Sequence, residues 1–247
     1  MKGFVCGAMA ACVSLCASAA GAADIKAKVS YLDFLYANTA SGTYGGYAGV
    51  GHPDFNSWSC GRTTGLVQST LVNRKPVYGP NGSQCIAGPA AFASWFKSVP
   101  GINVPIRGTL TLSDIGGGVH QYTNPAFYPL DGKGFNTTGD QSDQDCSDGV
   151  TPHNFAFTMQ AHWTGEVTST SQYISITADD DTWLFVNNHL IVDLGGVHGA
   201  STGSYTFSIP NMVAIGISLN QPVAFDLFHA ERHTCASTFT LTTTLTP

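Results

Sequence analysis

Three consecutive carboxylates, Asp179, Asp180 and Asp181, are the residues whose type and spacing best suit them to chemistry. They stand between an alternating run over 172–178 and an apolar hairpin over 182–194. Like charges this close repel one another, so a folded protein keeps them together when a positive charge offsets the cost. A bound cation is the simplest such charge. Calcium is the first candidate, because it prefers carboxylate and carbonyl oxygens.

Strand direction predicts the neighbours of this triplet. The hairpin turns at Asn187-Asn188, since Asn tolerates the positive φ of tight turns, and it returns to a glycine-rich loop over 195–199. Two further strands lead to a turn over 231–237. If successive strands alternate in direction, both loops lie at the same end as the triplet. We therefore expect a rim that adds these residues to the triplet: Asp193, Gly196, His198, Glu231, Arg232 and His233.

Two interpretations are open for several of these residues. The triplet is either a calcium site or an Asx-type turn with solvated carboxylates. Asp193 is either a fourth ligand or a partner for nearby backbone amides. Gly196 and its neighbouring glycines permit unusual backbone geometry. Arg232 balances the charge of the acids. An acidic stretch over 140–149 lacks the glycine and the closing acid of the helix-loop-helix calcium motif, so a solvated loop is expected there.

A zinc site is a further alternative. His229, Glu231 and His233 alternate along the chain, so on an extended strand they share one face and could join His198 around a metal. For other catalysis the sequence offers little. It has no Gly-x-Ser-x-Gly elbow, phosphate loop or dinucleotide fingerprint, and Glu166 and Glu231 are its two glutamates. The expected protein is not an enzyme.

Composition excludes some partners and predicts export. The net charge is −6 and 11% of residues are charged, which argues against binding nucleic acid or an anionic membrane. Lys2, an apolar run and an Ala-x-Ala pattern predict a secretory signal peptide over 1–23. The rest, 24–247, is expected to form one secreted domain. It has no apolar run near the roughly 20 residues that span a membrane.

Four cysteines remain after the expected signal peptide: Cys60, Cys85, Cys146 and Cys235. An even number in an exported chain predicts two disulfides. Of the three possible pairings, we favour Cys60 with Cys85, which closes a short local loop. Cys146 would then pair with Cys235 and tie a long loop to the last hairpin.

The fold is predicted to be mostly β, because turn residues separate segments rich in Thr, Val, Ile and aromatic residues. One short helix is expected over Ala90–Lys97, after Pro89. The expected strands cover Ala27–Leu35, Gly108–Leu112, Asn154–Gly165, Gln172–Ala178, Trp183–Val186, Leu190–Val192, Ser204–Ile209, Val223–His229 and Thr238–Leu245.

The run from Asp179 to Gly199 resembles the core of the fibro-slime domain. Further resemblance lies in Gly51-His52-Pro53-Asp54-Phe55, Lys75-Pro76-Val77-Tyr78, Tyr128–Gly134, Phe225–Phe228 and Ala230–His233. This resemblance implies an antiparallel β-sandwich of the lectin-like, protective-antigen type, found in adhesins and flocculins, with long loops.

In flocculin-type members of that wider class, paired aspartates before a core strand bind Ca²⁺, which contacts sugar hydroxyls. The resemblance carries this role to Asp179, Asp180 and Asp181. The expected function is thus a secreted, calcium-binding adhesion or carbohydrate-recognition module, with an extracellular glycan or a cell-surface or matrix component as partner. The alternative is a structural matrix or surface protein in which calcium only stiffens the rim loops.

Overall fold

The computed structural model describes residues 23–36, 51–55, 59–135, 153–234 and 236–245, and the backbone of 43–44, 47–48 and 143–144. The described elements are, in chain order, β1 (Ile25–Phe34), β2 (Thr43–Tyr44), β3 (Tyr47–Ala48), the 3-10 helix η1 (Gly82–Gln84), α1 (Pro89–Phe92), β4 (Asn103–Asp114), β5 (His120–Asn124), β6 (Asp143–Gln144), β7 (His153–Asn154), β8 (Phe157–Glu166), β9 (Tyr173–Asp179), β10 (Asp181–Val186), β11 (His189–Leu194), β12 (Ser201–Thr206), α2 (Ile209–Ala214), β13 (Pro222–Glu231) and β14 (Thr238–Thr243).

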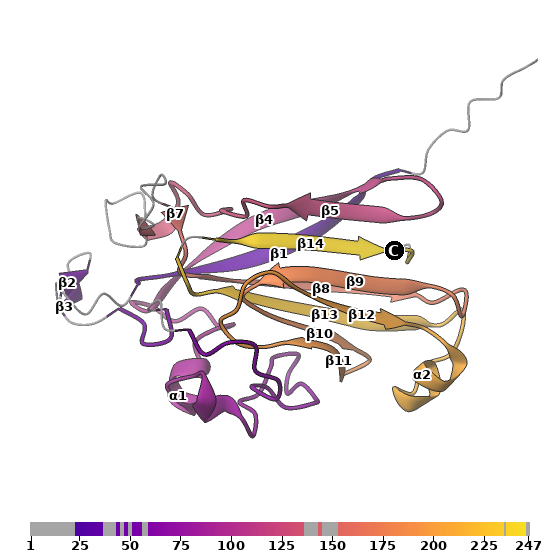
Figure 1. Cartoon of the computed structure of the whole chain (residues 1–247), viewed down its shortest axis with the longest axis horizontal. Coiled ribbons are helices and arrows are strands. Elements are labelled where there is room, and N and C mark those ends of the chain that lie inside the picture. The colour runs from indigo at the N-terminus through magenta and orange to yellow at the C-terminus, as the bar shows by residue number, and fades with distance from the viewer. Residues whose placement is uncertain are drawn as a thin grey trace, which may run out of the picture.

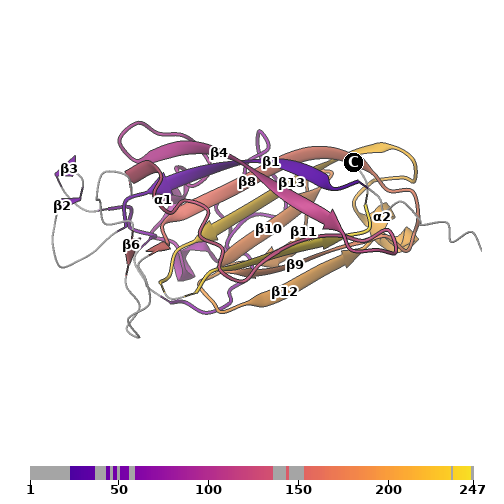
Figure 2. The same cartoon turned by 90° about the horizontal axis from the view of Figure 1, so that it is seen from above.

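Ten of these strands form two packed layers (Figure 1). One layer has the order β11-β10-β13-β8-β1-β4, and the other has the order β5-β14-β9-β12. A short β4–β5 pairing joins them, and the pairs within both layers are antiparallel. Figure 2 separates β9 and β12 from β8 and β13 of the facing layer. The expected all-β, antiparallel sandwich is confirmed.

The main core lies between the two layers. In β9, Ile174, Ile176 and Ala178 are buried and the residues between them are half-buried, as the alternation of the sequence predicts. They pack in one cluster with residues of the facing layer such as Phe157 and Leu227. This packing fixes the register of β9, because a slip by one residue would turn its apolar side chains to solvent.

A second core covers the other face of the six-stranded layer. The segment over 51–102, which includes α1, packs Trp95 against Trp183 of β10 and Phe96 against Phe228 of β13. Every residue of β10 is therefore buried. Burial on both faces explains why this strand reads as a continuous apolar run rather than an alternating one.

The expected helix over Ala90–Lys97 is shorter in the structure, where α1 ends at Phe92. After Ala93 the hydrogen bonds are those of turns, with the Ser94 amide bound to the Ala91 carbonyl and the Trp95 amide bound to the Phe92 carbonyl. Groups from outside bind the carbonyls that follow. The side chain of Asn103 donates to the Ser94 and Lys97 carbonyls, and the Thr158 hydroxyl donates to the Trp95 carbonyl. Phe92, Trp95 and Phe96 are all buried.

The other departure is α2, which lies where a strand end and a connection were expected. The strand predicted over Ser204–Ile209 ends at Thr206. The helix begins after Ser208, and Pro210 in its first turn suits a helix start. The Tyr205 hydroxyl donates to the Asn211 carbonyl at 2.8 Å and holds the helix against β12. No helix within the described residues is long and apolar enough to cross a membrane.

Candidate functional site

Three connections between the two layers occur at the same end of the sandwich. Asp179, the last residue of β9, pairs with Thr238 in one layer, and Asp181, the first residue of β10, pairs with Ala230 in the other. The segment between β13 and β14 and the loop between β11 and β12 make the same change of layer. The Asp triplet, the loop over 195–200 and the turn over 231–237 therefore meet. We call this end the acidic rim.

Hydrogen bonds confirm the expected convergence of these loops. The Gly196 amide donates to Asp181 Oδ1 at 2.6 Å, and the His198 amide donates to Asp180 Oδ1 at 2.9 Å. From the other loop, the Arg232 and His233 amides donate to Asp180 Oδ2 at 3.0 and 3.1 Å. The carboxylates thus organise the loops around them, since each buried amide needs an acceptor.

Asp181 is neutralised within the protein. Its Oδ2 accepts a hydrogen bond from Arg232 Nε at 2.7 Å, and both side chains are almost completely buried. Arg232 also donates from Nη1 to the Cys85 carbonyl at 2.9 Å, and its guanidinium lies 4.8 Å from the ring centroid of Trp95. Arg232 thus supplies, at Asp181, the positive charge that the sequence predicted for the triplet.

The remaining carboxyl groups lack such a counter-charge. Burial and the neighbouring Asp180 raise the pKa of Asp179 from 3.8 to about 8. Burial and the charge of Asp181 raise the pKa of Asp180, although Arg232 and two backbone amides act against this change. Burial and the charges of Asp180 and Asp179 raise the pKa of Glu231 well above its usual value; a side-chain hydrogen bond with Asp180 adds to this change, and one with Ser237 acts against it. These three acids are either partly protonated or matched by a bound cation.

Glu231 shows most directly that a counter-charge is missing. Its side chain is fully buried, and its Oε2 has no hydrogen-bond partner among the described residues. Its Oε1 accepts a long 3.4 Å hydrogen bond from the His233 amide. A buried, unpartnered carboxylate oxygen is costly unless a proton or a metal ion meets it. The sequence analysis placed Glu231 at the rim and considered it as a zinc ligand, not as a calcium ligand.

Asp193 binds nearby backbone amides, which is the second of the two roles considered for it. Its Oδ1 accepts from Trp183 Nε1 at 3.0 Å and from the Gly195 amide at 3.1 Å, and its Oδ2 accepts from the Gly65 amide at 2.8 Å. These contacts show Asp193 as a partner of backbone amides, and its role as a metal ligand stays a prediction. Its carboxylate holds the loop over 61–65 against the end of β11.

The histidines do not converge on one point. His229 is fully buried, its Nδ1 lies 2.9 Å from the Thr182 hydroxyl, and burial lowers its pKa to about 3. The rings of Phe127, Phe157 and Phe239 surround it.

The two rim histidines contact backbone instead. Both ring nitrogens of His198 lie against the carbonyls of Leu194 and Gly199, and His233 Nδ1 lies against the Thr234 carbonyl. The zinc arrangement therefore does not assemble from these side chains.

The Cys60–Cys85 disulfide is confirmed, with the two Cα atoms 5.6 Å apart. It supports the rim from behind, because the Val197 amide donates to Cys60 Sγ at 3.2 Å and Arg232 binds the Cys85 carbonyl. The pairing of Cys146 with Cys235 lies outside the described residues. So do the expected signal peptide before Ala23 and most of the acidic stretch over 140–149.

A hard cation fits the donor chemistry of the rim. Asp179, Asp180 and Glu231 present carboxylate oxygens, which calcium prefers, and Glu231 Oε2 is free to meet an ion. Within the described residues, no three His, Cys, Asp or Glu side chains already stand as a formed metal cage. Occupancy would thus require these side chains to move, and further oxygens would have to come from backbone, water or ligand.

The fold and the site together define an all-β protein with a buried, acidic loop cluster at one end. No protein-family model matches the chain. It is similar to psiQ of Dictyostelium discoideum, with 36% identity over 190 residues, or 75% of this chain and 19% of that protein. It is also similar to psiD of the same organism, with 34% identity over 193 residues, or 75% of this chain and 36% of that protein. The chain thus spans about a fifth to a third of these relatives.

Solved structures resemble the chain in part. The PA14 domain of the MpAFP antifreeze protein overlays on 50% of this chain and 65% of that chain, with 12% identity and a TM-score of 0.29. The PA14 sugar-binding domain from an RTX adhesin overlays on 50% of this chain and 68% of that chain, with 15% identity and a TM-score of 0.28. Overlays with such low scores do not establish a shared fold.

Proposed function

We propose that this chain is a secreted, non-catalytic adhesion module of the fibro-slime type that binds Ca²⁺ at the acidic rim and recognises carbohydrate there. One observation carries the proposal. Asp179, Asp180 and Glu231 are buried together with raised pKa values, and an oxygen of Glu231 has no partner among the described residues. A divalent cation satisfies all three acids at once.

In this proposal Asp179, Asp180 and Glu231 hold the ion. Bound calcium supplies a coordination sphere of roughly six to eight oxygens, which leaves positions for the vicinal hydroxyls of a sugar. Asp181 and Asp193 have another task. Asp181 fixes Arg232 and Gly196, and Asp193 fixes the loop behind them, so the ligand oxygens are held in place.

The sequence supports the adhesion class. The run from Asp179 to Gly199, by which the chain resembles the fibro-slime domain, forms the strands and the loop of the acidic rim. The similarity to the psi proteins extends over about three quarters of the chain. The Cys60–Cys85 disulfide is in keeping with an oxidising, extracellular location, as is the predicted signal peptide over 1–23.

A structural role is the alternative. Four amides, those of Gly196, His198, Arg232 and His233, bind the carboxylates of Asp180 and Asp181. A cation at the rim would therefore stiffen two loops even without a sugar. In this case calcium stabilises the protein, but no glycan binds.

A calcium-dependent glycan array tests the proposal. We expect binding with calcium, loss of binding with a chelator, and recovery when calcium returns. Asp179→Asn should abolish the signal, while Asp131→Asn, at an exposed carboxylate bound to His153, should leave it unchanged. Calcium-induced thermal stabilisation with a blank array would favour the structural alternative. Neither stabilisation nor glycan binding, in protein shown to be folded, would reject both.

A further inference from the structure

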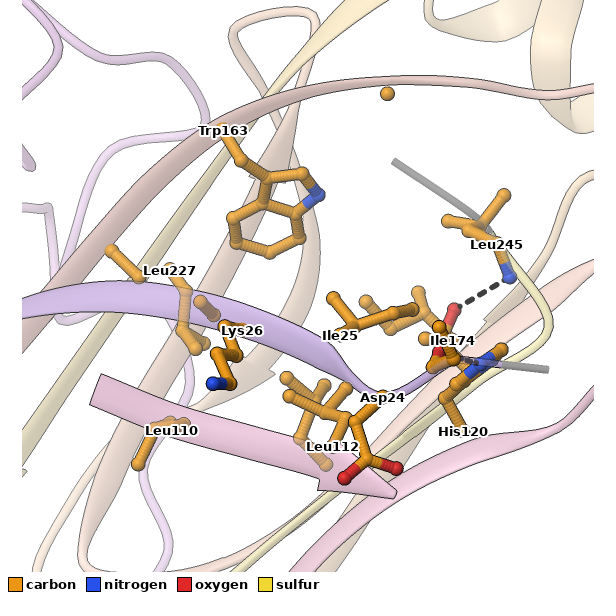
Figure 3. A pocket seen from close by; sticks show the side chains of 16 residues that line it. Asp24, Ile25, Lys26, Leu110, Leu112, His120, Trp163, Ile174, Leu227 and Leu245 are labelled. Carbon is orange, nitrogen blue, oxygen red and sulfur yellow. Dashed lines mark hydrogen bonds between the residues drawn. The ribbon is translucent and has the colours of Figure 1, made fainter. Parts of the chain in front are cut away.

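A cavity of about 410 Å³ lies between the two layers, at the opposite end of the sandwich from the acidic rim. Figure 3 shows its walls, with aliphatic side chains from both layers around the space and the ring of Trp163 on one side. The first residues of β1 and β9 and the last residues of β8 and β14 meet here. The volume falls within the range of roughly 300–1,000 Å³ typical of small-molecule sites.

Small side chains in the strands leave this space. Ala27 of β1, Ala161 of β8 and Gly165 of β8 all line the cavity. Ala161 pairs with Val29 on one side and Leu227 on the other, so it lies in the middle of the six-stranded layer. Protein interiors are normally close-packed, and a void of this size forfeits many van der Waals contacts. An apolar molecule would restore these contacts.

Most of the lining is apolar, Asp24, Lys26, His120 and Thr243 are its polar residues, and one buried polar atom stands out. His120 is 2% exposed, and its Nδ1 has no hydrogen-bond partner among the described residues. Its Nε2 lies 3.2 Å from the Ala23 carbonyl, which can only accept a hydrogen bond. The proton therefore sits on Nε2, and Nδ1 presents a lone pair. Because Nδ1 is also closed to a water-sized molecule, a ligand that satisfies this atom must donate a hydrogen bond and the imidazole must turn towards the cavity.

We propose that this cavity binds a straight-chain aliphatic molecule that carries one hydroxyl group. The chain fills the space between the layers, in contact with residues such as Ile25, Leu112 and Ile174, and the hydroxyl donates to His120 Nδ1. An aliphatic alcohol has this chemistry, and a protonated fatty acid shares it. The inference is independent of the acidic rim and of calcium.

A homologous series of alcohols tests the proposal on the unmodified protein. Displacement of the fluorescent probe N-phenyl-1-naphthylamine by 1-hexanol, 1-octanol and 1-decanol gives the three affinities. Each methylene group that becomes buried should raise the affinity about fourfold, until the cavity is full. Saturable binding of one molecule per chain supports the proposal. Affinity that does not depend on chain length, or probe uptake without saturation, overturns it.

Substitutions locate the site. Ala161→Phe fills the cavity and should abolish displacement, while Thr164→Phe, at an exposed position of the same strand, should leave it unchanged. Ala27→Phe fills the cavity from β1 and provides a second test if the first variant fails to fold. Equal binding by folded Ala161→Phe or Ala27→Phe and by the unmodified protein would place the ligand elsewhere.

A further variant tests the role of His120. We expect His120→Leu to weaken 1-octanol about fivefold, because one hydrogen bond is lost, and to leave n-octane unchanged. If both ligands change equally, His120 shapes the wall and does not bind the hydroxyl, and the ligand class proposed above is wrong.

Discussion

Arg232 Nε lies 2.7 Å from Asp181 Oδ2, and the two side chains are 2% and 0% exposed. This contact divides the Asp triplet into two parts. Asp181 is a buried ion-pair partner that belongs to the framework. Asp179 and Asp180 share the remaining negative charge with Glu231, 50 or more residues along the chain. The framework acid and the candidate ligands therefore respond differently to substitution.

The buried ion pair should dominate the stability of the rim. We expect Arg232→Met to lower the free energy of unfolding by about 3–5 kcal/mol, because it leaves Asp181 buried without its partner. Arg74→Met is the matched control. Arg74 is half-exposed, and its buried partner Asp226 keeps His162 Nδ1 at 2.6 Å, so removal of Arg74 should cost clearly less than removal of Arg232. Urea unfolding measures both values, and equal costs would contradict the framework role of Arg232.

The candidate ligands should lose calcium stabilisation without loss of the fold. At calcium concentrations about 100 times the Kd, bound calcium should stabilise the unmodified protein by about 2.7 kcal/mol. Glu231→Gln and Asp179→Asn should lose this gain. In a chelator, Glu231→Gln should be at least as stable as the unmodified protein, because it removes a buried acid that lacks a counter-charge. Calcium titrations followed by thermal melting separate the two effects, and an undiminished gain in Glu231→Gln would exclude it as a ligand.

The rim acids predict how stability depends on pH in the absence of calcium. The pKa of Asp179 rises from 3.8 to about 8 on folding, so between these values the folded state holds a proton that the unfolded state has lost. Its contribution to stability is thus fully present below pH 3.8 and declines as pH rises towards 8. The raised pKa of Glu231 acts in the same direction.

The titration of His229 changes stability in the opposite direction, and it does so over a lower pH range. Its pKa falls from 6.5 to about 3 on folding, so its contribution is present above pH 6.5 and is lost as pH falls towards 3. From pH 6.5 to 8 the acids therefore decide the slope. We expect the melting temperature in chelator to fall over this range, and saturating calcium to abolish the fall. Asp179→Asn should show a shallower slope in chelator, and an unchanged slope would refute the assignment.

The Cys60–Cys85 disulfide should stabilise the fold by about 3 kcal/mol, in line with a closed loop whose ends are 25 residues apart. A reducing agent should lower the urea midpoint accordingly. The double variant Cys60→Ala, Cys85→Ala is the control, and any effect of the reductant on it belongs to other cysteines. A double variant as stable as the oxidised protein would show that the bridge contributes nothing.

Local patterns in the sequence predicted much of the fold. The alternation over 172–178 gave β9, and Asn187-Asn188 gave the hairpin turn, where both residues have positive φ values of 47° and 67°. Such features depend on near neighbours, so a single sequence contains them. The convergence of three loops at the Asp triplet also followed from strand direction. The sequence did not predict that these loops cross from one layer to the other, because strands that alternate in direction give the same sequence pattern in one sheet as in two.

The sequence named Arg232 as a counter-charge and backbone amides as possible partners of Asp193, but it could not assign these roles to individual acids, because they depend on distant residues. The Gly65 amide that binds Asp193 is 128 residues away, and the Arg232 side chain that neutralises Asp181 is 51 residues away. Nothing in the local pattern around either acid distinguishes it from a ligand. Likewise Asn103, which binds the Ser94 and Lys97 carbonyls beyond the end of α1, reaches them only after the chain has turned back.

Ala23 and Leu245, close to the two ends of the described chain, both line the cavity, at the opposite end from the acidic rim. The described chain thus begins and stops at the end of the sandwich opposite the carboxylate loops. A tag placed directly before Ala23 or after Leu245 would hold the protein with the acidic rim facing away from a bead or sensor surface. A protein attached at either position would approach the opposite end of the sandwich and leave the carboxylate loops unobstructed.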